Sequence, residues 1–239
     1  MTEPIRIFVG TDERMGKAEL ALEASVRHHT SAEVEFTWMR LGNGLEFEGW
    51  DIGRDPGHPY SGEGWATDFT NFRWAVPDLA DFEGTAIYMD ADMVALGDIN
   101  ELVLSLSDHA LCAWPGEGKH GRPDLIVFNC SHRFWLQTTW PSIGDMKING
   151  WPYHKYRDLI ISLHNRCVLP PEWDCLDGKG LSANTKLIHF TNMRTQPWRP
   201  WPDVFDYDKY GPHRCQEAVD IFWHWHKQGL EMQNAAGVD

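Results

Sequence analysis

The sequence predicts an α/β protein whose central sheet is mixed, mostly parallel and flanked by helices. The chain opens with an apolar run at Ile5–Val9, a segment with helical spacing at Lys17–His29 and a β-rich run at Val34–Met39. A strand, a helix and a second strand in this order are typical of a parallel α/β unit. Two more apolar, β-prone runs follow at Thr85–Met89 and Leu125–Asn129, and we expect them to be further strands of the sheet.

The remaining segments are assigned in chain order by the same patterns. Residues 42–64 are rich in Gly, Pro and Asp, which predicts a long irregular loop of the kind that often carries function. Spacing and capping residues predict helices over Thr67–Leu79, 99–106, Tyr153–Leu163 and Cys215–Gln228. Strands are expected at Ala110–Trp114 and Lys186–Phe190. No repeat or linker divides the chain, so we expect one domain over residues 1–239, with an irregular Trp- and Pro-rich segment at 191–239 covering the cleft.

The composition excludes some classes of protein. Lys and Arg number 21 against 35 Asp and Glu, a formal net charge of −14, whereas nucleic-acid binders depend on cationic contacts with phosphates. No apolar run is long enough to span a membrane, and the first residues lack the layout of a signal peptide. The five cysteines are odd in number and form no Cys-x-x-Cys pair, which fits reduced thiols. We therefore expect a cytoplasmic protein with neither a nucleic-acid partner nor a membrane span.

The sharpest feature of the sequence is Asp90-Ala91-Asp92, which ends the apolar run at Thr85–Met89. Ionised Asp is rarely left unpaired beside an apolar core, and a bound cation would balance the charge. Mn²⁺ and Mg²⁺ prefer oxygen ligands and are held by one or two carboxylates together with substrate phosphates. The carboxyl end of a strand is also where open α/β sheets bind ligands. The position favours a metal–diphosphate site, although the bare Asp-x-Asp pattern also occurs in loops and helix caps.

Six segments together resemble glycosyltransferases of the GT-A type, in particular family 8 and its bacterial relatives. The segment around Asp90-Ala91-Asp92 resembles the metal-binding segment of that family, and the other five occur in the family's order. These five are 7–12 (IFVGTD), 66–74 (ATDFTNFRW), 125–130 (LIVFNC), 170–175 (PPEWDC) and 189–198, which contains His189-Phe190 and Pro197-Trp198. The resemblance covers most of the chain and implies a single GT-A, Rossmann-like domain.

The resemblance implies an enzyme that transfers a sugar from a nucleotide-sugar donor, a UDP-sugar, to a saccharide or another hydroxyl acceptor. It implies a divalent ion, Mn²⁺ or Mg²⁺, held by Asp90, Asp92 and His189 against the diphosphate of the donor. Such an ion acts as a Lewis acid and stabilises the departing nucleoside diphosphate. The relatives retain the anomeric configuration, so the resemblance implies the same outcome here.

The resemblance also assigns residues to the donor. The donor-binding set is Gly10, Thr11, Asp12, Arg73, Asp90, Ala91 and Trp198. Within it, Thr11 and Asp12 would contact the base or the ribose, and Arg73 would steer the diphosphate or brace Asp90. A turn-forming pair at Thr11 and Asp12, and a surface ion pair at Arg73, are the structural alternatives.

Two residues are assigned to catalysis by the resemblance, Asn129 and Asp174. Asn129 would donate a hydrogen bond to a sugar hydroxyl, and the alternative is a polar residue that merely ends a strand. His189 is the strongest of the twelve histidines as a ligand because it ends a strand within a matching motif. A structural, hydrogen-bonded histidine is its alternative.

The sequence departs from the family pattern at four places. Met15 stands where many members carry a Tyr that stacks on the base, and Gln196 stands where a Lys often contacts the diphosphate. Asp174 replaces the usual Asn after Trp173. Tyr153-His154-Lys155-Tyr156 occupies the region where many members have an Asp-Gln pair. These departures affect the identity of the donor more than the metal site.

Two other functions remain open on the sequence alone. A sugar nucleotidyltransferase also uses an acidic metal site at strand ends, but it normally needs a basic, Gly-rich loop, and residues 10–14 offer one Gly and one Arg. A non-catalytic carbohydrate-binding protein would use the Trp-rich tail to stack on sugars. That second alternative leaves Arg73, Asn129 and His189 without a role.

Overall fold

The computed structural model describes residues 3–40, 69, 72–107, 109–117, 121–136, 153–162 and 165–237, without the side chains of residues 153–156. The predicted loop at 42–64 and residues 66–68, 70 and 71 of the segment before Phe72 lie outside the described residues. The contacts divide the chain into two compact units. Unit 1 consists of Met1–Asp12, Glu33–Asp90 and Glu101–Leu169, and unit 2 consists of Glu13–Ala32, Ala91–Asn100 and Pro170–Asp239.

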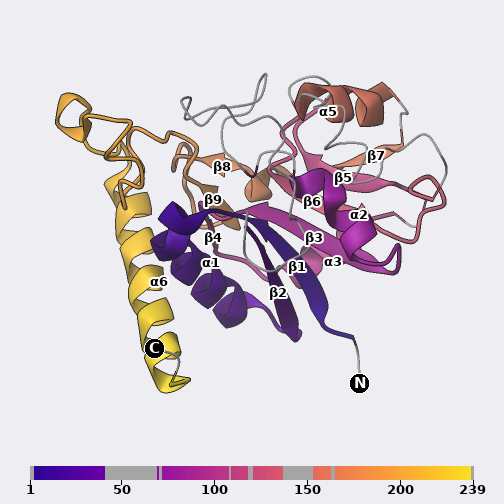
Figure 1. The fold of residues 1–239 in the computed structure, drawn as a ribbon, viewed down its shortest axis with the longest axis horizontal. Helices are drawn as coiled ribbons and strands as arrows, with labels where there is room; N and C mark the ends of the chain where they lie inside the picture. The colour runs from indigo at the N-terminus through magenta and orange to yellow at the C-terminus, as the bar shows by residue number, and fades with distance from the viewer. Residues whose placement is uncertain are drawn as a thin grey trace. The chain divides into compact units, whose positions relative to one another are not determined.

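Unit 1 is built on a six-stranded sheet in the order β2-β1-β3-β6-β5-β7 (Figure 1). The strands are β1 (Ile5–Gly10), β2 (Val34–Met39), β3 (Thr85–Asp90), β5 (Cys112–Pro115), β6 (Leu125–Asn129) and β7 (Arg166–Leu169). β1 runs parallel to β2 and β3, and β5 runs parallel to β7. β6 runs antiparallel to both of its neighbours, β3 and β5. The predicted fold class, a mixed and mostly parallel sheet with helices, is confirmed.

The interior strands of this sheet are buried on both faces. Consecutive side chains of a strand point to opposite faces, yet Ile7, Val9, Ile87 and Met89 all have 0% exposure, and Phe8 and Tyr88 between them are buried as well. Strands covered on both faces read as continuous apolar runs, which is how β1 and β3 stand out in the sequence.

The helices of unit 1 are short, namely α2 (Val76–Leu79), α5 (Tyr153–Ser162) and α3 (Asn100–Ser105), which starts at the unit boundary. The described part of the predicted helix at Thr67–Leu79 is a 3-10 turn at Phe72–Ala75 followed by α2. Pro77 lies in the first turn of α2, where a proline loses no helical hydrogen bond, and does not end a longer helix. β7 was not predicted. Its four residues include the charged Arg166, and they show no alternation of polar and apolar side chains that would indicate a strand.

Unit 2 contains a three-stranded sheet in the order β4-β9-β8. The strands are β4 (Met93–Ala95), β8 (Cys175–Leu176) and β9 (Leu187–His189), with β9 antiparallel to β4 and parallel to β8. Only β9 was predicted, as Lys186–Phe190. The other two strands have three and two residues, which is too few for a periodic pattern.

Two long helices complete unit 2. Helix α1 (Gly16–His29) packs along helix α6 (Gln216–Ala235), and Figure 1 shows the two side by side. α6 continues past the predicted end at Gln228 because Phe222, Trp225 and Gly229 keep one buried face. At Gly229 a Cβ would lie 2.4 Å from the carbonyl oxygen of Leu20, so only glycine permits this approach of the two helices.

The chain crosses between the two units five times, at residues 12–13, 32–33, 90–91, 100–101 and 169–170. All five cysteines lie in the described part of the chain and none forms a disulfide. Burial raises the pKa of the Cys130 thiol to about 12. Among the described helices, none combines the length and the apolar character that a membrane crossing requires.

The helix contact at Gly229 gives a first test. We expect Gly229→Ala to destabilise the protein by about 1–3 kcal/mol, since the added methyl group overpacks the contact and alanine's helix propensity recovers only part of the loss. The melting temperature in differential scanning calorimetry measures the change. Gly16→Ala is the matched control, because a Cβ on Gly16 in α1 meets no atom within 4 Å. A Gly229→Ala variant as stable as the wild type would show that the two helices separate without cost.

Candidate active site

The carboxylate of Asp90 ends the buried strand β3 and is held by two donors of unit 1. The Tyr88 hydroxyl donates to Oδ1 at 2.6 Å. Arg73 Nη2 lies 3.0 Å from Oδ1 and 3.3 Å from Oδ2. Arg73 is only 3% exposed, so this ion pair is withdrawn from water. Of the two roles that the resemblance gave to Arg73, the contacts match the bracing of Asp90.

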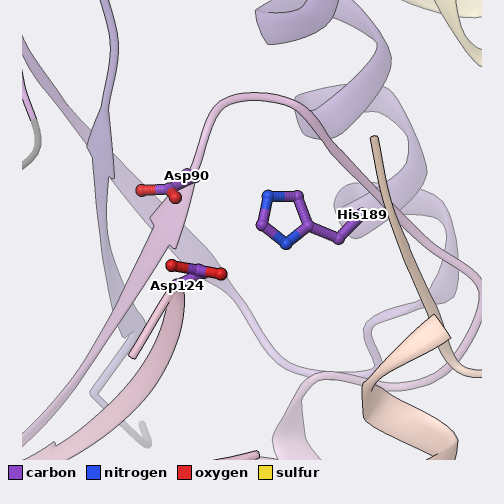
Figure 2. A group of neighbouring side chains, drawn as sticks. All are labelled: Asp90, Asp124 and His189. Atoms are coloured by element: carbon purple, nitrogen blue, oxygen red, sulfur yellow. The ribbon is translucent and has the colours of Figure 1, made fainter. Parts of the chain in front are cut away.

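Asp124 is a second carboxylate beside Asp90 (Figure 2), and carboxylate oxygens of the two residues lie within 4.8 Å of one another. Asp124 precedes β6, and because β6 runs antiparallel to β3, its start meets the end of β3. Arg73 Nη1 donates to Asp124 Oδ1 at 2.9 Å and also to the carbonyl oxygen of Pro123. Arg122 Nη2 donates to Asp124 Oδ2 at 2.7 Å. Two guanidinium groups therefore balance two carboxylates at this edge of the sheet.

Gly10 provides the space for the Tyr88 hydroxyl. Gly10 pairs with Asp90 in the register of β1 and β3, and a Cβ on Gly10 would lie 2.1 Å from the Tyr88 oxygen and 3.0 Å from the ring of Phe69. Burial, together with the charge of Asp90, raises the pKa of Tyr88 well above its ordinary value, although Arg73 opposes the shift. The phenol stays protonated and donates to Asp90. The contact of Gly10 with the donor stays a prediction.

In unit 2, Asp92 precedes β4 and lies beside His189, the last residue of β9. The register of the two strands pairs Met93 with His189, and the N–H of Phe190 donates to the carbonyl oxygen of Asp92 at 2.9 Å. Nε2 of His189 lies 3.1 Å from Asp92 Oδ1, and the two side chains are 7% and 13% exposed. The ring of His189, which ends β9, is also drawn in Figure 2.

Gln196 holds Asp92 from the other side. Its Nε2 donates to Asp92 Oδ2 at 2.9 Å and to the carbonyl oxygen of Phe190 at 2.7 Å. Both partners are acceptors, which fixes the amide orientation with Oε1 pointing elsewhere. Gln196 is 1% exposed, so the amide is part of the buried framework of Asp92. The residue that departs from the family's Lys therefore positions a carboxylate of the Asp-x-Asp motif.

Near Asp92, the buried Oε1 of Gln196 has no hydrogen-bond partner among the described atoms, and the neighbour of Asp92 Oδ1 is the imidazole Nε2 of His189, 3.1 Å away. Buried acceptors are normally paired, and each one left unpaired costs free energy. A carboxylate oxygen, an amide oxygen and the imidazole nitrogen of His189 are ligand types that Mn²⁺ and Mg²⁺ accept. The side chains present in unit 2 thus fit a hard divalent cation.

The other donor-binding candidates lie in both units. Thr11 follows β1 in unit 1 and is 1% exposed, and Asp12 beside it is half-buried. Ala91 is fully buried at the start of unit 2. Trp198 is 5% exposed and stacks on Phe222, with ring centroids 4.7 Å apart, so its observed contacts are packing contacts within unit 2. Their contacts with a donor stay predictions.

The structure does not bring Asn129 together with Asp90. In the antiparallel register of β3 and β6, Asn129 pairs with Thr85, at the opposite end of β3. Thr85 and Asp90 are five steps apart along an extended strand, a distance of roughly 17 Å. Asp174 lies in unit 2 just before β8, two register positions from the residue that pairs with His189. The catalytic role of either residue stays untested.

Asp124 and Arg122 were not predicted from the sequence as residues of the site, and no contact was predicted for Tyr88. The signal for Asp124 was present, since an acidic residue stands immediately before the apolar run at 125–129. Its meaning depended on the strand direction, which an apolar run does not reveal. If β6 ran parallel to β3, Asp124 would lie at the opposite end of the strands from Asp90.

The charge balance around Arg73 gives a second test. Arg73→Leu leaves the buried carboxylate of Asp90 without its cation, while Asp124 keeps Arg122, and we expect a loss of about 3 kcal/mol in the free energy of unfolding at neutral pH. The uncompensated carboxyl of Asp90 then has a raised pKa in the folded state, so the stability of the variant falls as the pH rises and is regained as the pH is lowered. The deficit against the wild type should shrink between about pH 7 and about pH 5 in urea titrations.

The control for this variant is Arg27→Leu, whose exposed pair with Glu23 at 2.8 Å should be worth less than about 0.5 kcal/mol. A deficit of Arg73→Leu that is independent of pH would contradict the proposed cause, since lost packing alone does not titrate.

Solved structures with the same fold are glycosyltransferases. GlyE of Streptococcus pneumoniae TIGR4 matches with a TM-score of 0.62 and 13% identity over 99% of this chain and 64% of its own. The galactosyltransferase LgtC, solved with donor and acceptor sugar analogues, matches with a TM-score of 0.57 and 11% identity over 93% of this chain and 95% of its own. WbbM, a bifunctional glycosyltransferase, matches with a TM-score of 0.61 and 14% identity over 83% of this chain. The chain spans 47% of the length of WbbM. These matches confirm the GT-A glycosyltransferase fold that the motifs predicted.

One curated relative is similar in sequence as well. No family model matches the chain. Protein CDI of Arabidopsis thaliana is 33% identical over 228 residues, which cover 84% of this chain and 82% of the relative. An identity of this level over most of both proteins shows common membership, and the chain belongs to the family of Protein CDI.

Proposed function

We propose that this protein is a glycosyltransferase that moves a sugar from a nucleotide-sugar donor, a UDP-sugar, to a saccharide or another hydroxyl acceptor, with retention of the anomeric configuration. The GT-A fold supports sugar transfer, and the resemblance of the motifs to family 8 supports the donor class and the stereochemistry. The five unpaired cysteines support a cytoplasmic setting. We further propose that the two units act as one catalytic domain, with residues 191–239 covering the donor.

The observation that carries the proposal is that buried side chains hold each of the two aspartates of the Asp-x-Asp motif. Asp90 is braced by Arg73 and Tyr88 in unit 1, and Asp92 is braced by Gln196 in unit 2. An Asp-x-Asp that merely formed a turn or a helix cap would need no buried residues dedicated to each carboxylate. The buried Gln196 Oε1, which has no hydrogen-bond partner among the described atoms, and the pairing of Asp92 Oδ1 with an imidazole, which can be neutral, and not with a Lys or Arg, support a cation bound beside them.

We assign a divalent ion, Mn²⁺ or Mg²⁺, to Asp90, Asp92 and His189. A single residue separates the two aspartates in the chain, and His189 lies beside Asp92 in unit 2. When bound, the ion supplies a Lewis acid that neutralises the charge developing on the diphosphate leaving group.

The neutral side chain of Gln196 has a consequence for the diphosphate. Family members often place a Lys at this position, whereas Gln196 brings no charge and its amide nitrogen is engaged by Asp92 and Phe190. Arg73 does not compensate, since its guanidinium is engaged by Asp90 and Asp124. That leaves the metal, or Arg194, Arg199 or Lys186, to supply the cation that meets the diphosphate. We propose that the metal does so, and we expect stricter metal dependence than in relatives with the Lys.

Donor contacts complete the proposal. Thr11 and Asp12 follow β1 at the same sheet edge as Asp90, which pairs with Gly10, and this supports a contact with the base or ribose. Asp174 remains the candidate for sugar recognition. The register that places Asn129 at the other end of β3 weighs against the same role for Asn129.

Calorimetric titration of UDP with and without Mn²⁺ tests the function. We expect the wild type to bind UDP at least about tenfold more tightly with Mn²⁺, and Asp92→Asn to lose most of that gain because the substitution removes the ligand charge. Glu231→Gln on the exposed face of α6 is the matched acid-to-amide control. UDP binding that ignores both the metal and the Asp92 variant would refute the proposal.

A panel of nucleotide sugars then separates the two alternative functions. Metal-dependent hydrolysis of a donor to UDP and free sugar supports the transferase. Release of pyrophosphate from UTP and a sugar phosphate would identify a nucleotidyltransferase instead. Binding of saccharides without turnover of any donor and without metal-dependent nucleotide binding would identify a carbohydrate-binding protein.

The role of Gln196 gives a separate prediction. Gln196→Leu keeps the side chain's size but removes both hydrogen bonds that orient Asp92 and Phe190, and outer partners of a metal ligand are worth about 10–100-fold in metal affinity. Titration of Mn²⁺, followed by electron paramagnetic resonance, should show a loss in that range. Gln228→Leu on α6 is the control, because Gln228 is half-buried and donates to Glu231, not to a proposed metal ligand. Unchanged Mn²⁺ affinity in Gln196→Leu would mean that Asp92 needs no positioning.

A further inference from the structure

A cavity of about 1050 Å³ lies within unit 2 and is not used by the proposed donor site. Its wall is made by the loop after β8, the residues that follow β9 and the segment before α6. It is lined by hydroxyl and amide groups of Thr191, Asn192 and Thr195 and by the ring of Tyr210. The volume suits a ligand of the size of one or two sugar rings, and the polar lining suits a ligand rich in hydroxyl groups.

The charge of the cavity is opposite to that of the protein. Lys179, Arg194, Lys209 and Arg214 line it against a single acid, Asp177, in a chain whose formal net charge is −14. Both oxygens of Asp177 already accept hydrogen bonds, from the hydroxyl of Thr191 at 2.7 Å and the N–H of Asn192 at 3.1 Å. In the described part of the chain, neither Lys179 nor Arg214 has an ion-pair partner, while Lys209 pairs with Asp206 at 2.8 Å.

Arg194 is held in place by aromatic rings. Its guanidinium carbon lies 5.2 Å from the ring centroid of Tyr210 and 5.9 Å from that of Phe205. Cation–π contacts of this kind restrict the side chain but leave its donors available. A planar fork of donors matches the oxygens of a phosphate or a carboxylate.

His213 adds a buried ring nitrogen at the wall. The residue is 8% exposed, and its Nδ1 lies 3.2 Å from the N–H and 3.1 Å from the carbonyl oxygen of Cys215, so the tautomer decides whether Nδ1 accepts or donates there. Nε2 has no hydrogen-bond partner among the described atoms and lies 3.9 Å from Asp177 Oδ1. A buried ring nitrogen without a hydrogen-bond partner favours a polar ligand group that completes it.

The cavity is connected to the proposed metal ligand His189. The N–H of Asp177 donates to the carbonyl oxygen of His189 at 2.8 Å, and Thr191 and Asn192 follow His189 directly in the chain. Asp177 has a φ of +51° and Gly178 has a φ of +69°, so the chain turns sharply to make this contact. The wall of the cavity is therefore joined to His189 by one backbone hydrogen bond and by the chain itself.

We infer that this cavity binds a saccharide carrying an anionic group, a phosphate or a carboxylate. Arg194, Arg214 and Lys179 bind the charge, and the side chains of Thr191 and Asn192 bind the hydroxyl groups. This inference extends the proposed function, since the ligand is the acceptor of the transferred sugar.

Calorimetry on the full chain, without metal or nucleotide, tests the cavity separately from the donor site. The probes are glucose 6-phosphate, glucuronate, inorganic phosphate and uncharged glucose. We expect saturable binding of at least one charged sugar, weakened by added salt, and none of glucose at the same concentration. Binding of glucose 6-phosphate alone assigns a phosphorylated acceptor, and binding of glucuronate alone assigns an acidic sugar. Equal binding of inorganic phosphate and glucose 6-phosphate would refute the saccharide.

Charge-removing variants locate the binding. Arg214→Gln and Lys179→Gln should each weaken the charged sugar by about fivefold, as expected for one exposed charge contact. Lys227→Gln is the control, because Lys227 on α6 pairs with Glu231 and does not line the cavity. Equal affinity in the double variant and the control would overturn the inference.

The two proposals fail separately. If charged sugars do not bind while Mn²⁺-dependent UDP binding is intact, the cavity assignment is wrong and the transferase stands. If charged sugars bind but UDP does not, the anionic ligand stands and its role as the acceptor is lost.

Discussion

A carboxylate at the end of a buried strand has to be neutralised inside the protein, and Asp90 places this constraint on unit 1. The guanidinium of Arg73 meets it from the 3-10 turn before α2, and the same guanidinium also serves Asp124. Gly10 on the neighbouring strand lacks a side chain because the Tyr88 hydroxyl needs that space to reach Asp90. Several residues that are far apart in sequence are thus fixed by one negative charge.

Asp92 is treated differently from Asp90. Its described partners are an imidazole and an amide, and no Lys or Arg in the described part of the chain pairs with it. A nearby fixed cation weakens the attraction of a carboxylate for a metal ion, whereas an amide that only orients the carboxylate leaves its charge in place. The two acids of one short motif are therefore unequal, and the greater share of cation attraction falls to Asp92.

The sequence predicted most of the sheet of unit 1 because buried strands are continuous apolar runs. It also predicted the importance of Asp90, Asp92 and His189 as potential ligands, and the structure places His189 beside Asp92. It did not predict the role of Asp124 or the position of Asn129, since both depend on β6 running antiparallel to β3. An apolar run carries no sign of its direction.

The role of Gln196 was also beyond the sequence. An amide at that position reads as the loss of a family Lys, and only the fold shows that it bonds to Asp92. The short strands β4 and β8 were not predicted for a related reason. They are defined by their pairing with β9 and have no sequence pattern of their own.

The order in which the chain passes between the units bears on how the protein is made. Helix α1 is synthesised long before its packing partner α6, which follows it in the chain after most of unit 1. A ribosome adds about 5–20 residues per second, so the apolar face of α1 waits on the order of ten seconds or more for its partner. Contacts between the two ends of the chain also slow folding, because a long loop must close before they form. Unit 2 therefore cannot be completed before α6 is made, and the nascent chain has a period in which chaperones and unwanted partners compete for the exposed face of α1.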